Sequence, residues 1–419
     1  MSTIGTILLY NKKKTYHPMM NVNWEEVFPM LKHWVFFDAA NQMIPGKYWL
    51  DGMKDCLGIY EHNPFSHADH PFLTTAFQEC ITRGAKLLHA KNSEVTNIYR
   101  VMTASNMIIN DLLSWEKGDN VVFTDLDYPS IPYILMDLAK RKGVELRRIA
   151  NVNNEILLSD VEKTVDDRTK LFVLNDTMCW SGFKYDTRAV SDICHEHGSY
   201  VLNDAIQSVG AIDVDVKKDD VDFLVTGSYK WQCGPEGAGI FYIKDELIDR
   251  FDPAFRNYLW ASLPNGIPFS HRDQDNMSSW RYPLLHNASR FDMGACVTPI
   301  LFGWNETLKF YEKIGIENVE RHVRELGDYA VDRISENGWK VLTPMDKRKR
   351  HGLIIYTTGS YEDDVKTQAR FNAEWTGRKP IKLCHRGIGG VIGLRVCCHM
   401  FNSKSDIDYL VETQKKILG

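Results

Sequence analysis

The sequence predicts an α/β protein whose larger part holds a mostly parallel sheet and whose smaller C-terminal part is α+β. Between about residues 95 and 245, short runs rich in β-branched residues alternate with amphipathic helical stretches. This rhythm is typical of crossover units around a sheet that is buried on both faces. Further along, two long helical patterns precede a pair of strands and a last helix. A chain of 419 residues has room for about two or three domains.

The elements of the larger part follow from local patterns. Strands are predicted where apolar and β-branched residues run together, and helices where apolar residues recur every three to four positions. A glycine ends each of the two clearest helices, as expected for a left-handed C-terminal position. We predict strands at 120–126, 144–150, 170–176, 199–204, 221–228 and 237–243, and helices at 130–143 and 187–198.

The last third of the chain has a different order of elements. It predicts helices at 299–315 and 316–338, strands at 339–344 and 351–358, and a final helix at 403–418. A stretch rich in Trp, His, Arg and Pro fits no regular element and is expected to be an irregular insertion. The predicted domains are an N-terminal arm (1–35), a large domain (36–292, with the insertion at about 255–292) and a small domain (293–419).

Composition excludes several classes of protein. The chain is 44% hydrophobic and 25% charged, with a net charge of -5 and no basic stripe, so we expect no nucleic-acid partner. No apolar run approaches about 18 residues, so no membrane span is predicted. The first residues carry lysines after a short apolar run, the reverse of the order in a signal peptide, and we expect a cytoplasmic protein.

The cysteines and histidines do not follow a metal-site pattern. Nine cysteines without regular spacing favour reduced thiols over a disulfide framework. The "VCCH" run (397–399 for its last three residues) and the trio of His62, His67 and His70 lack the spacing of zinc ligands. We therefore predict no metal site.

Polar side chains stand where predicted parallel strands end, which is where ligands collect in such sheets. Asp204 closes the strand 199–204, Gln207 follows three positions later, and Lys230 follows the strand 221–228. An acid, an amide and a lysine suit a cofactor with an aldehyde and a basic ring nitrogen, because the amine condenses with the aldehyde and the acid holds the ring proton. On the residues alone, a helix-capping Asp204 and a surface Lys230 remain the alternative.

The ordered combination D-x-x-Q (204–207), S-Y-K-W (228–231) and G-P-x-G-x-G (234–239) is specific. It resembles the cofactor segment of the class V aminotransferase family of fold type I pyridoxal-phosphate enzymes, which includes cysteine desulfurases, kynureninase and isopenicillin N epimerase. The resemblance extends from "FFDAANQMIPG" (36–46) to "LRVCCHMFNSKSDIDYL" (394–410). It implies a seven-stranded, mostly parallel sheet, pyridoxal 5'-phosphate as cofactor, an amino acid as substrate and a homodimer.

The resemblance also implies roles for single residues around the ring of the cofactor. Lys230 is expected to bind the aldehyde and later to move the α-proton of the substrate. Asp204 is expected to pair with the ring nitrogen and Gln207 to lie near the ring hydroxyl. Tyr128, in "DYPS", corresponds to an aromatic residue that stacks on the ring. Trp231 directly follows Lys230 in the sequence, and we expect it to serve packing rather than chemistry.

The phosphate and the substrate have their own expected partners. The stretch "TASNMIIN" (103–110) resembles the phosphate loop of the family, which places Ser105 and Asn106 at a helix N-terminus beside the phosphate. Tyr229 is expected to reach the phosphate, with Ser228 as a weaker candidate. Arg395 matches the arginine that grips the substrate α-carboxylate with a planar fork, and Asn41 and Arg386 are expected to line the same site.

The chain departs from the family pattern at several positions. Ala295 stands where many members have a threonine that reaches the phosphate of a partner subunit. Cys384 lies only 11 residues before Arg395, closer than the nucleophilic cysteine of desulfurases, and we expect it to be a structural thiol, with a catalytic thiol as the alternative. Asp176 replaces a histidine that is common in relatives. Four further residues have two interpretations. They either make the substrate pocket aromatic or are ordinary core and surface residues: Trp180, His271, Trp280 and Tyr282.

The motifs imply bond breaking at the α-carbon of an amino acid but leave the outcome open. We expect a lyase that releases a leaving group from the side chain, of the carbon–sulfur or kynureninase type. An epimerase of the isopenicillin N epimerase type and an aminotransferase stay as alternatives, because reaction type depends on pocket geometry rather than on fold. A non-catalytic pyridoxal-phosphate-binding protein is the alternative from a different class.

Overall fold

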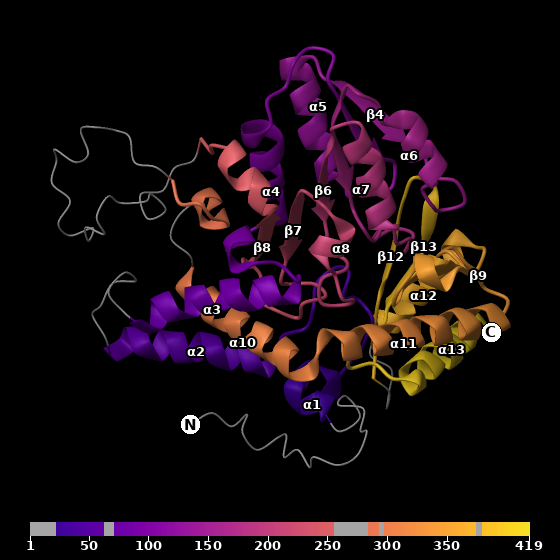
Figure 1. Ribbon diagram of the computed structural model, residues 1–419. Helices are drawn as coiled ribbons and strands as arrows, with labels where there is room; N and C mark the ends of the chain where they lie inside the picture. The colour runs from indigo at the N-terminus through magenta and orange to yellow at the C-terminus, as the bar shows by residue number, and fades with distance from the viewer. Residues whose placement is uncertain (1–21, 63–70, 255–283, 293–296, 374–378) are drawn as a thin grey trace.

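The computed structural model describes residues 22–62, 71–254, 284–292, 297–373 and 379–419, and its larger part is built on a seven-stranded sheet (Figure 1). The strand order is β2-β8-β7-β6-β5-β3-β4. All neighbouring pairs are parallel except those that β8 makes with β2 and β7. The predicted mostly parallel, seven-stranded sheet is thus confirmed. In that order the strands are Val95–Asn97, Gly239–Ile243, Phe223–Gly227, Tyr200–Asp204, Thr169–Leu174, Asn120–Thr124 and Glu145–Ile149.

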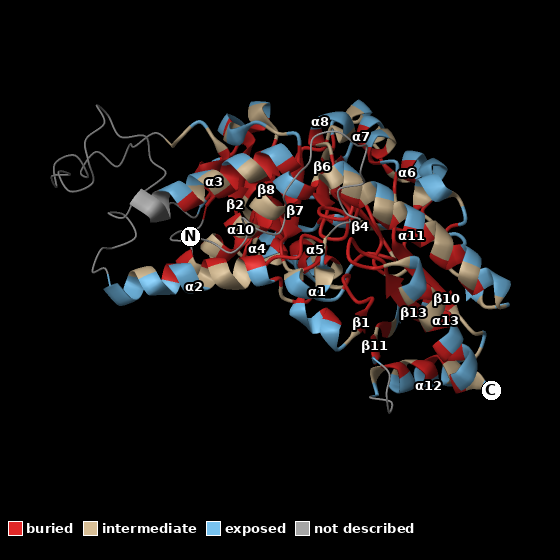
Figure 2. Cartoon of the chain, turned by 90° about the horizontal axis from the view of Figure 1, so that it is seen from below, coloured by how far each residue is buried: buried red, intermediate tan, exposed pale blue. Residues whose placement is uncertain are grey.

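Both faces of this sheet are covered, as the alternation along β5 illustrates. Phe172 and Leu174 belong to one apolar cluster, whereas Leu171 and Val173 belong to another. Successive side chains of a strand point to opposite faces, so the sheet carries a separate core on each side. Figure 2 shows these strands as the buried centre of the molecule. The helices connected to them are α4 (Val101–Met107), α5 (Ser130–Lys142), α6 (Leu158–Thr164), α7 (Thr187–Glu196) and α8 (Val216–Asp219).

Three long helices pack together beside the sheet (Figure 1). They are α2 (Lys47–His62), α3 (Pro71–Leu87) and α10 (Thr298–Ile314), and α11 (Ile316–Glu336) continues from the last of them. The contact of α2 with α10 is close because glycine stands at the crossing: a Cβ on Gly303 would lie 3.0 Å from Trp49 O. The helix that follows residue 293 therefore packs on helices from the start of the chain, and the predicted domain boundary stays a prediction.

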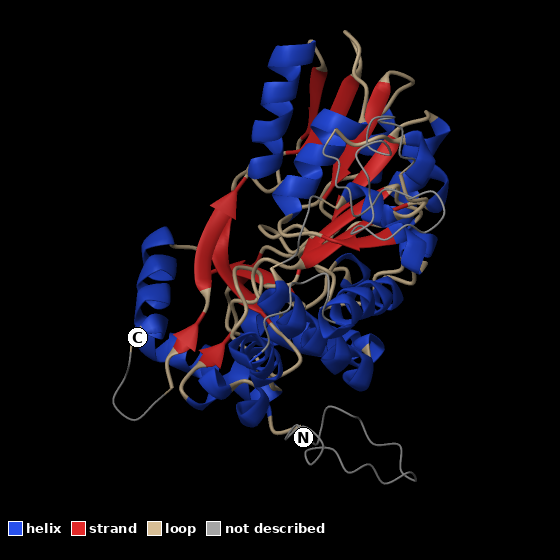
Figure 3. Ribbon diagram, turned by 90° about the vertical axis from the view of Figure 1, so that its left-hand side faces the viewer, coloured by secondary structure: helices blue, strands red, loops and turns tan. Residues whose placement is uncertain are grey.

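The smaller part is an antiparallel four-stranded sheet in the order β12-β13-β10-β9 (Figure 3). Its strands are Cys384–Ile388, Val391–Cys397, Leu353–Thr357 and Lys340–Val341. The helices α12 (Tyr361–Asn372) and α13 (Lys404–Leu418) pack on it together with α11. The early strand β1 (Val35–Phe36) pairs in parallel with β11 (Ile381–Lys382), so the start of the described chain joins its end.

Short helical elements complete the described chain. They are α1 (Trp24–Val27), the π-helix Ile108–Leu112 that continues α4, and 3₁₀ helices at Pro29–Lys32, Asn92–Glu94, Asp245–Arg250, Ala288–Phe291 and Lys347–Lys349. No helix among the described residues has the length and apolar character that a membrane crossing needs. Eight of the nine cysteines lie in the described ranges, and all eight are buried free thiols.

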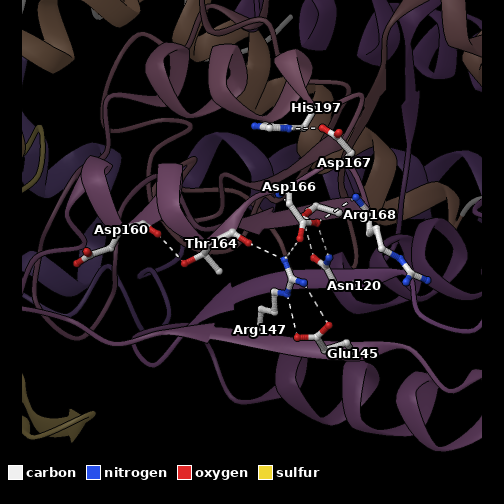
Figure 4. A network of polar contacts seen from close by, with 10 residues as sticks. Asn120, Glu145, Arg147, Asp160, Thr164, Asp166, Asp167, Arg168 and His197 are labelled. Atoms are coloured by element: carbon white, nitrogen blue, oxygen red, sulfur yellow. Dashed lines mark hydrogen bonds and ion pairs between the residues drawn. The ribbon is translucent and has the colours of Figure 1, made fainter.

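A polar network closes the amino-terminal edge of the large sheet (Figure 4). Arg147 on β4 lies 2.7 Å from Asp166 and 2.9 Å from Glu145. Asn120, at the start of β3, donates to Asp166 at 3.0 Å. Burial opposes the charge of Asp166, but hydrogen bonds from Arg147 and Asn120 hold its pKa at about 2. Ion pairs and hydrogen bonds therefore hold the amino-terminal ends of these strands together. The side chains predicted for the site lie at the opposite, carboxyl ends of the strands.

Candidate active site

Lys230 lies at the carboxyl end of β7, in the loop that leads back to β8. It is only 8% exposed, and its Nζ lies 5.6 Å from the ring centroid of Tyr128 and 5.8 Å from that of Tyr229. Burial lowers the pKa of Lys230 below its usual value, with Arg395 acting in the same direction and Asp204 against it. A buried lysine with a lowered pKa carries a neutral amine more readily, which is the form that attacks an aldehyde.

Asp204 ends β6, the neighbour of β7, and is 4% exposed. Burial raises the pKa of Asp204 to about 6, although Lys230 acts in the opposite direction. Its Oδ1 accepts a hydrogen bond from Ile206 N at 3.2 Å. Asn175, just after β5, donates to Asp204 O at 3.4 Å and accepts from Tyr128 N at 3.3 Å. Asn175 thus joins the loops after three neighbouring strands, β3, β5 and β6.

Gln207 lies three residues after Asp204 and is held at both ends of its amide. Its Nε2 donates to Ala40 O at 3.1 Å, and its Oε1 accepts from Trp231 Nε1 at 2.8 Å. Trp231 is fully buried. The expectation that Trp231 serves packing is thus incomplete, because its indole N–H also bonds a residue of the site.

Arg395 enters from β13 of the small sheet and is 4% exposed. Its Nη2 lies 3.4 Å from Asp38 Oδ1, and its Nη1 donates to Cys179 O at 3.3 Å. The Nε of Arg395 has no hydrogen-bond partner among the described residues. Asn41 donates from Nδ2 to Asp38 Oδ2 at 3.3 Å, so the loop after β1 brings Asn41 to the same place as Arg395.

An aromatic pair and a thiol occupy the loops after β3 and β5. The rings of Tyr128 and Trp180 are parallel within 2°, with centroids 6.3 Å apart. Cys179 is buried, and burial raises the pKa of its thiol to about 11, although Arg395 and Lys230 act in the opposite direction. A neutral thiol therefore lies within electrostatic reach of both the lysine and the arginine.

The residues expected at the phosphate differ in where the structure places them. Helix α4 begins at Val101, so Ser105 lies one turn inside it, fully buried and with no hydrogen-bond partner for Oγ among the described residues. Asn106 is exposed and donates from Nδ2 to Met102 O at 2.9 Å. Neither forms the N-cap, which is Arg100. Thr103 N and Ala104 N already donate to Arg100 O at 3.1 and 3.4 Å, which leaves the N–H groups of Val101 and Met102 as donors in the first turn.

Tyr229 and Ser228 also differ in whether their hydroxyl groups are available to the phosphate. Tyr229 is half-buried, and burial raises the pKa of its hydroxyl to about 12. Ser228 Oγ donates to Pro235 O within the same loop. A hydroxyl has one hydrogen, so Ser228 closes the loop and has none left for an anion. Its expected contact with the phosphate therefore has no donor in this geometry.

Cys384 and Arg386 lie on β12, next to the strand of Arg395. Cys384 pairs directly with Arg395 across the two strands, is 4% exposed, and burial raises its pKa to about 11. It is thus a protonated thiol on a strand, consistent with the expected structural role. Arg386 is exposed, so the structure does not bring its side chain into the buried cluster around Arg395.

Asp176, the predicted departure from the family, is turned inward. Ser208 Oγ donates to its Oδ1, and burial raises its pKa. Most of the insertion predicted at 255–292 lies outside the described residues. The same holds for six residues considered above for a metal site, the substrate pocket or the phosphate contact: His67, His70, His271, Trp280, Tyr282 and Ala295. Among the described residues, no group of three or more His, Cys, Asp and Glu is arranged to hold a metal ion.

The donor set fits pyridoxal phosphate. It combines a buried lysine, a carboxylate that ends the neighbouring strand, an amide with a free N–H and an aromatic ring over the lysine. Tyr128 is 45% exposed, so part of its ring surface is open to a ligand. The unpaired Nε of Arg395 is a free donor for a carboxylate. These groups match an aldehyde, a ring nitrogen, a ring hydroxyl and the carboxylate of an amino acid.

Sequence reasoning missed three residues of this site. Asn175 and Cys179 follow β5, and the rule that selected Asp204 at the end of β6 applies equally to them. Asp38 directly follows an apolar pair in "VFFD", and only its place in the family pattern near Asn41 marks it.

Several curated relatives match nearly the whole chain. A probable cysteine desulfurase of Halalkalibacterium halodurans is 25% identical over 91% of this chain and 92% of its own length. The cysteine desulfurase of Haloferax volcanii is also 25% identical, over 90% of this chain and 88% of its own length. An uncharacterized aminotransferase of Schizosaccharomyces pombe is 26% identical over 86% of this chain and 85% of its own.

Solved structures share the fold. The apo cysteine desulfurase of Thermococcus onnurineus superposes with a TM-score of 0.79 at 21% identity, covering 94% of this chain and 97% of that one. A cystine C–S lyase in complex with its reaction product cysteine persulfide gives the same TM-score at 19% identity, over 92% of this chain and 98% of that one. At these identities the likeness concerns the fold. The family model "Aminotransferase class-V" matches residues 36–410, and the chain belongs to the class V aminotransferase family.

Proposed function

We propose that the protein is a pyridoxal-phosphate-dependent lyase that cleaves a carbon–sulfur bond in the side chain of an amino acid. The observation that carries this proposal is the buried Lys230, with the carboxylate of Asp204 at the end of the neighbouring strand and the ring of Tyr128 facing its amine. The curated relatives named as cysteine desulfurases support carbon–sulfur chemistry over epimerisation and transamination.

When bound, pyridoxal phosphate supplies an aldehyde that takes the amino group of the substrate and a ring that stores the electron pair released at the α-carbon. Lys230 anchors this group and, with its lowered pKa, takes and returns the proton at the α-carbon. Asp204 stabilises a positive ring nitrogen by opposite charge. Gln207 donates its remaining N–H to the ring hydroxyl, and Tyr128 stacks on the ring and excludes water from one face.

The substrate and the phosphate contact other parts of the chain. Arg395 binds the α-carboxylate, and Asn41 lies beside it through their shared partner Asp38. The first turn of α4, with Ser105 behind it, and Tyr229 receive the phosphate, because a helix N-terminus offers free N–H groups to an anion. Burial raises the pKa of the Cys179 and Cys384 thiols to about 11, so we assign the nucleophile to neither of them.

The experiment compares the native protein with Lys230→Ala after adding pyridoxal phosphate. Native protein should gain an absorption band near the visible edge, and borohydride reduction followed by peptide mass spectrometry should find the cofactor fixed on Lys230. The matched control is Lys218→Ala, at an exposed position of α8. Absence of the band in native protein, or a cofactor fixed elsewhere, overturns the cofactor site.

A second assay addresses the reaction. With L-cysteine as probe, sulfide released with pyruvate and ammonia supports the lyase, and so does alanine formed while an added thiol takes the sulfur as a persulfide. With L-cystine, cysteine persulfide released with pyruvate and ammonia supports it. Racemised substrate with nothing released supports an epimerase instead, and a keto acid formed with the aminated cofactor supports an aminotransferase. Cofactor binding without any change to the amino acids tested supports a non-catalytic protein.

We further propose a cytoplasmic homodimer. Eight buried free thiols suit a reducing compartment, and the family resemblance implies the dimer. Analytical ultracentrifugation should give about twice the chain mass of 48.3 kDa, and a mass of one chain at micromolar concentration contradicts the dimer.

A further inference from the structure

The indole of Trp231 and the amide of Gln207 form a buried pair beside Lys230. Trp231 Nε1 donates to Gln207 Oε1 at 2.8 Å, and Gln207 Nε2 donates to Ala40 O at 3.1 Å. Trp231 is fully buried and Gln207 is 4% exposed. An indole N–H only donates and a backbone carbonyl only accepts, so both partners demand the same orientation of the amide. The oxygen of Gln207 must face Trp231, and its nitrogen must face away.

A flipped amide is disfavoured at both ends. It would set Nε2 of Gln207 against the indole N–H, donor against donor, and Oε1 against the carbonyl of Ala40, acceptor against acceptor. Both groups would then be buried without partners, which is costly away from water. Since Nε2 carries two hydrogens and Ala40 takes one, a single N–H of known direction is left over.

Trp231 is itself held from the opposite side. Its carbonyl oxygen accepts from Tyr311 Oη at 2.6 Å and from His399 Nε2 at 2.8 Å. Met400 N donates to His399 Nδ1 at 2.7 Å, so Nδ1 has no hydrogen and Nε2 carries it. Burial lowers the pKa of His399 to about 4, which keeps this ring a neutral donor at physiological pH.

The backbone around Trp231 leaves no room for a larger neighbour. Gly210 has φ of +97°, and a Cβ added to it would lie 2.4 Å from Trp231 O. His399, the histidine of the "VCCH" run, lacks the spacing of a metal ligand and instead donates a hydrogen bond to Trp231 O. His399 comes four residues after Arg395, so β13 carries the arginine and the segment directly after this strand holds Trp231 through His399.

We propose that Trp231 is a positioning residue that locks the amide of Gln207 with its nitrogen toward the cofactor ring. This inference rests on the proposed function. A donor fixed in this way stabilises an ionised ring hydroxyl over a protonated one, because a hydrogen bond to the charged form favours that form. Trp231 acts only through Gln207 and touches no reacting atom.

The test is a double-mutant cycle with Trp231→Phe, Gln207→Met and the double variant. Phenylalanine keeps an aromatic ring but removes the N–H. The readouts are the dissociation constant of pyridoxal phosphate and the ratio of the two absorption bands of the ionised and protonated ring hydroxyl at one fixed pH. With Gln207 present, Trp231→Phe should weaken binding about fivefold, the worth of one neutral hydrogen bond, and should shift the ratio toward the protonated band.

In the Gln207→Met background, Trp231→Phe should change neither readout. Equal effects in both backgrounds, or no effect in either, overturn the proposal. Trp304→Phe is the matched control, because Trp304 is also fully buried and its Nε1 lies 3.4 Å from a different amide oxygen, Oε1 of Gln232. Its substitution should leave the band ratio unchanged.

A second measurement needs neither a folded Trp231→Phe protein nor bound cofactor. In cofactor-free protein labelled with ¹⁵N-tryptophan, Gln207→Met should move one slowly exchanging indole N–H resonance and speed its exchange. Indole resonances that all stay in place overturn the pair. If native protein binds no pyridoxal phosphate, the proposed function fails, and the resonance still decides separately whether Trp231 orients Gln207.

Discussion

Arg395 and Asp38 form a buried ion pair, with 3.4 Å between Nη2 and Oδ1 and each side chain no more than 5% exposed. The carboxylate of Asp38 thus occupies part of the donor fork that we assign to the carboxylate of the substrate. Lys382 lies 3.9 Å from the same Asp38, so this carboxylate has a second cation beside Arg395. An internal carboxylate of this kind holds the arginine in place and competes with the ligand.

Arg395→Lys should raise the KM for L-cysteine about 10- to 100-fold, because a lysine ammonium cannot reproduce the planar fork and a charge-assisted hydrogen bond is lost. The absorption band of bound cofactor should stay unchanged. Steady-state kinetics and a spectrum check both. The control Arg141→Lys, on the exposed side of α5, should behave as native protein. An unchanged KM for Arg395→Lys removes this residue from the substrate site.

Asp38→Asn should change stability and KM in opposite directions. Removing one partner of a buried pair leaves Arg395 uncompensated, so the free energy of unfolding should fall by about 3 kcal/mol. The KM for L-cysteine should fall several-fold, because the internal competitor is gone. Urea unfolding and kinetics measure the two effects, and a rise in KM contradicts the competition.

Tyr128→Phe should bind pyridoxal phosphate as native protein does, whereas Tyr128→Ala should bind it about 10-fold more weakly. Aromatic stacking contributes about 0.5–1.5 kcal/mol beyond the area that it buries. A titration followed by absorbance gives both constants. Tyr133→Ala is the control, since Tyr133 is 72% exposed on α5. Equal losses for Phe and Ala at position 128 would show that the hydroxyl, not the ring, matters.

Asp127→Asn should stabilise the cofactor-free protein at high pH only. Burial raises the pKa of Asp127 to about 7, whereas an unfolded aspartate titrates near 3.9. Between about pH 4 and 7 the native state holds this proton and the unfolded state does not. The stability that protonated Asp127 contributes is therefore complete below about pH 4 and is lost as the pH rises through about 7. Asparagine keeps the bond from Thr124 N and carries no charge.

The stability difference between Asp127→Asn and native protein should therefore grow to about 4 kcal/mol at about pH 8 and vanish near pH 4. Urea unfolding across this range measures it. The exposed Asp137→Asn should show no such slope, and a constant difference at all pH values would falsify the assignment to Asp127.

Cys384→Ala should keep the rate of sulfide release within about threefold of native protein, because a thiol that stays protonated is a poor nucleophile. Burial holds the pKa of Cys384 at about 11, and the residue lies on a strand opposite Arg395. A loss of activity above 100-fold, with the cofactor spectrum intact, would assign the nucleophile to Cys384.

The sequence allowed the prediction of those parts of the site that lie on clear strands. The runs that end at Asp204 and Gly227 are rich in apolar and β-branched residues, so the ends of these strands were predictable from pattern, whereas the roles of Asp204 and Lys230 came from the family resemblance. The start of α4 was not. Serine and asparagine in "TASN" suggested a cap, but the helix starts where the chain leaves β2, with Arg100 as N-cap, and so Ser105 falls inside it.

The pairs that complete the site could not be predicted, because they join distant positions without a local signal. Trp231 and Gln207 are 24 positions apart, and an apolar tryptophan next to a lysine gives no sign of a hydrogen bond to an amide. The seating of Arg386 on an exposed part of β12 likewise depends on strand register, which the sequence alone leaves undetermined.

The pairing of the early segment with the end of the chain has a consequence for biosynthesis. Asp38 precedes Arg395 by 357 positions, and Asn402 donates to Phe36 O from 366 positions away. At about 5–20 residues per second, the ribosome releases the first half of this contact roughly 20–70 s before the second. The large sheet can form in that interval, whereas the segment around Phe36 waits without its partner. The site is therefore among the last regions to assemble on the nascent chain, and its apolar flank is available to chaperones until then.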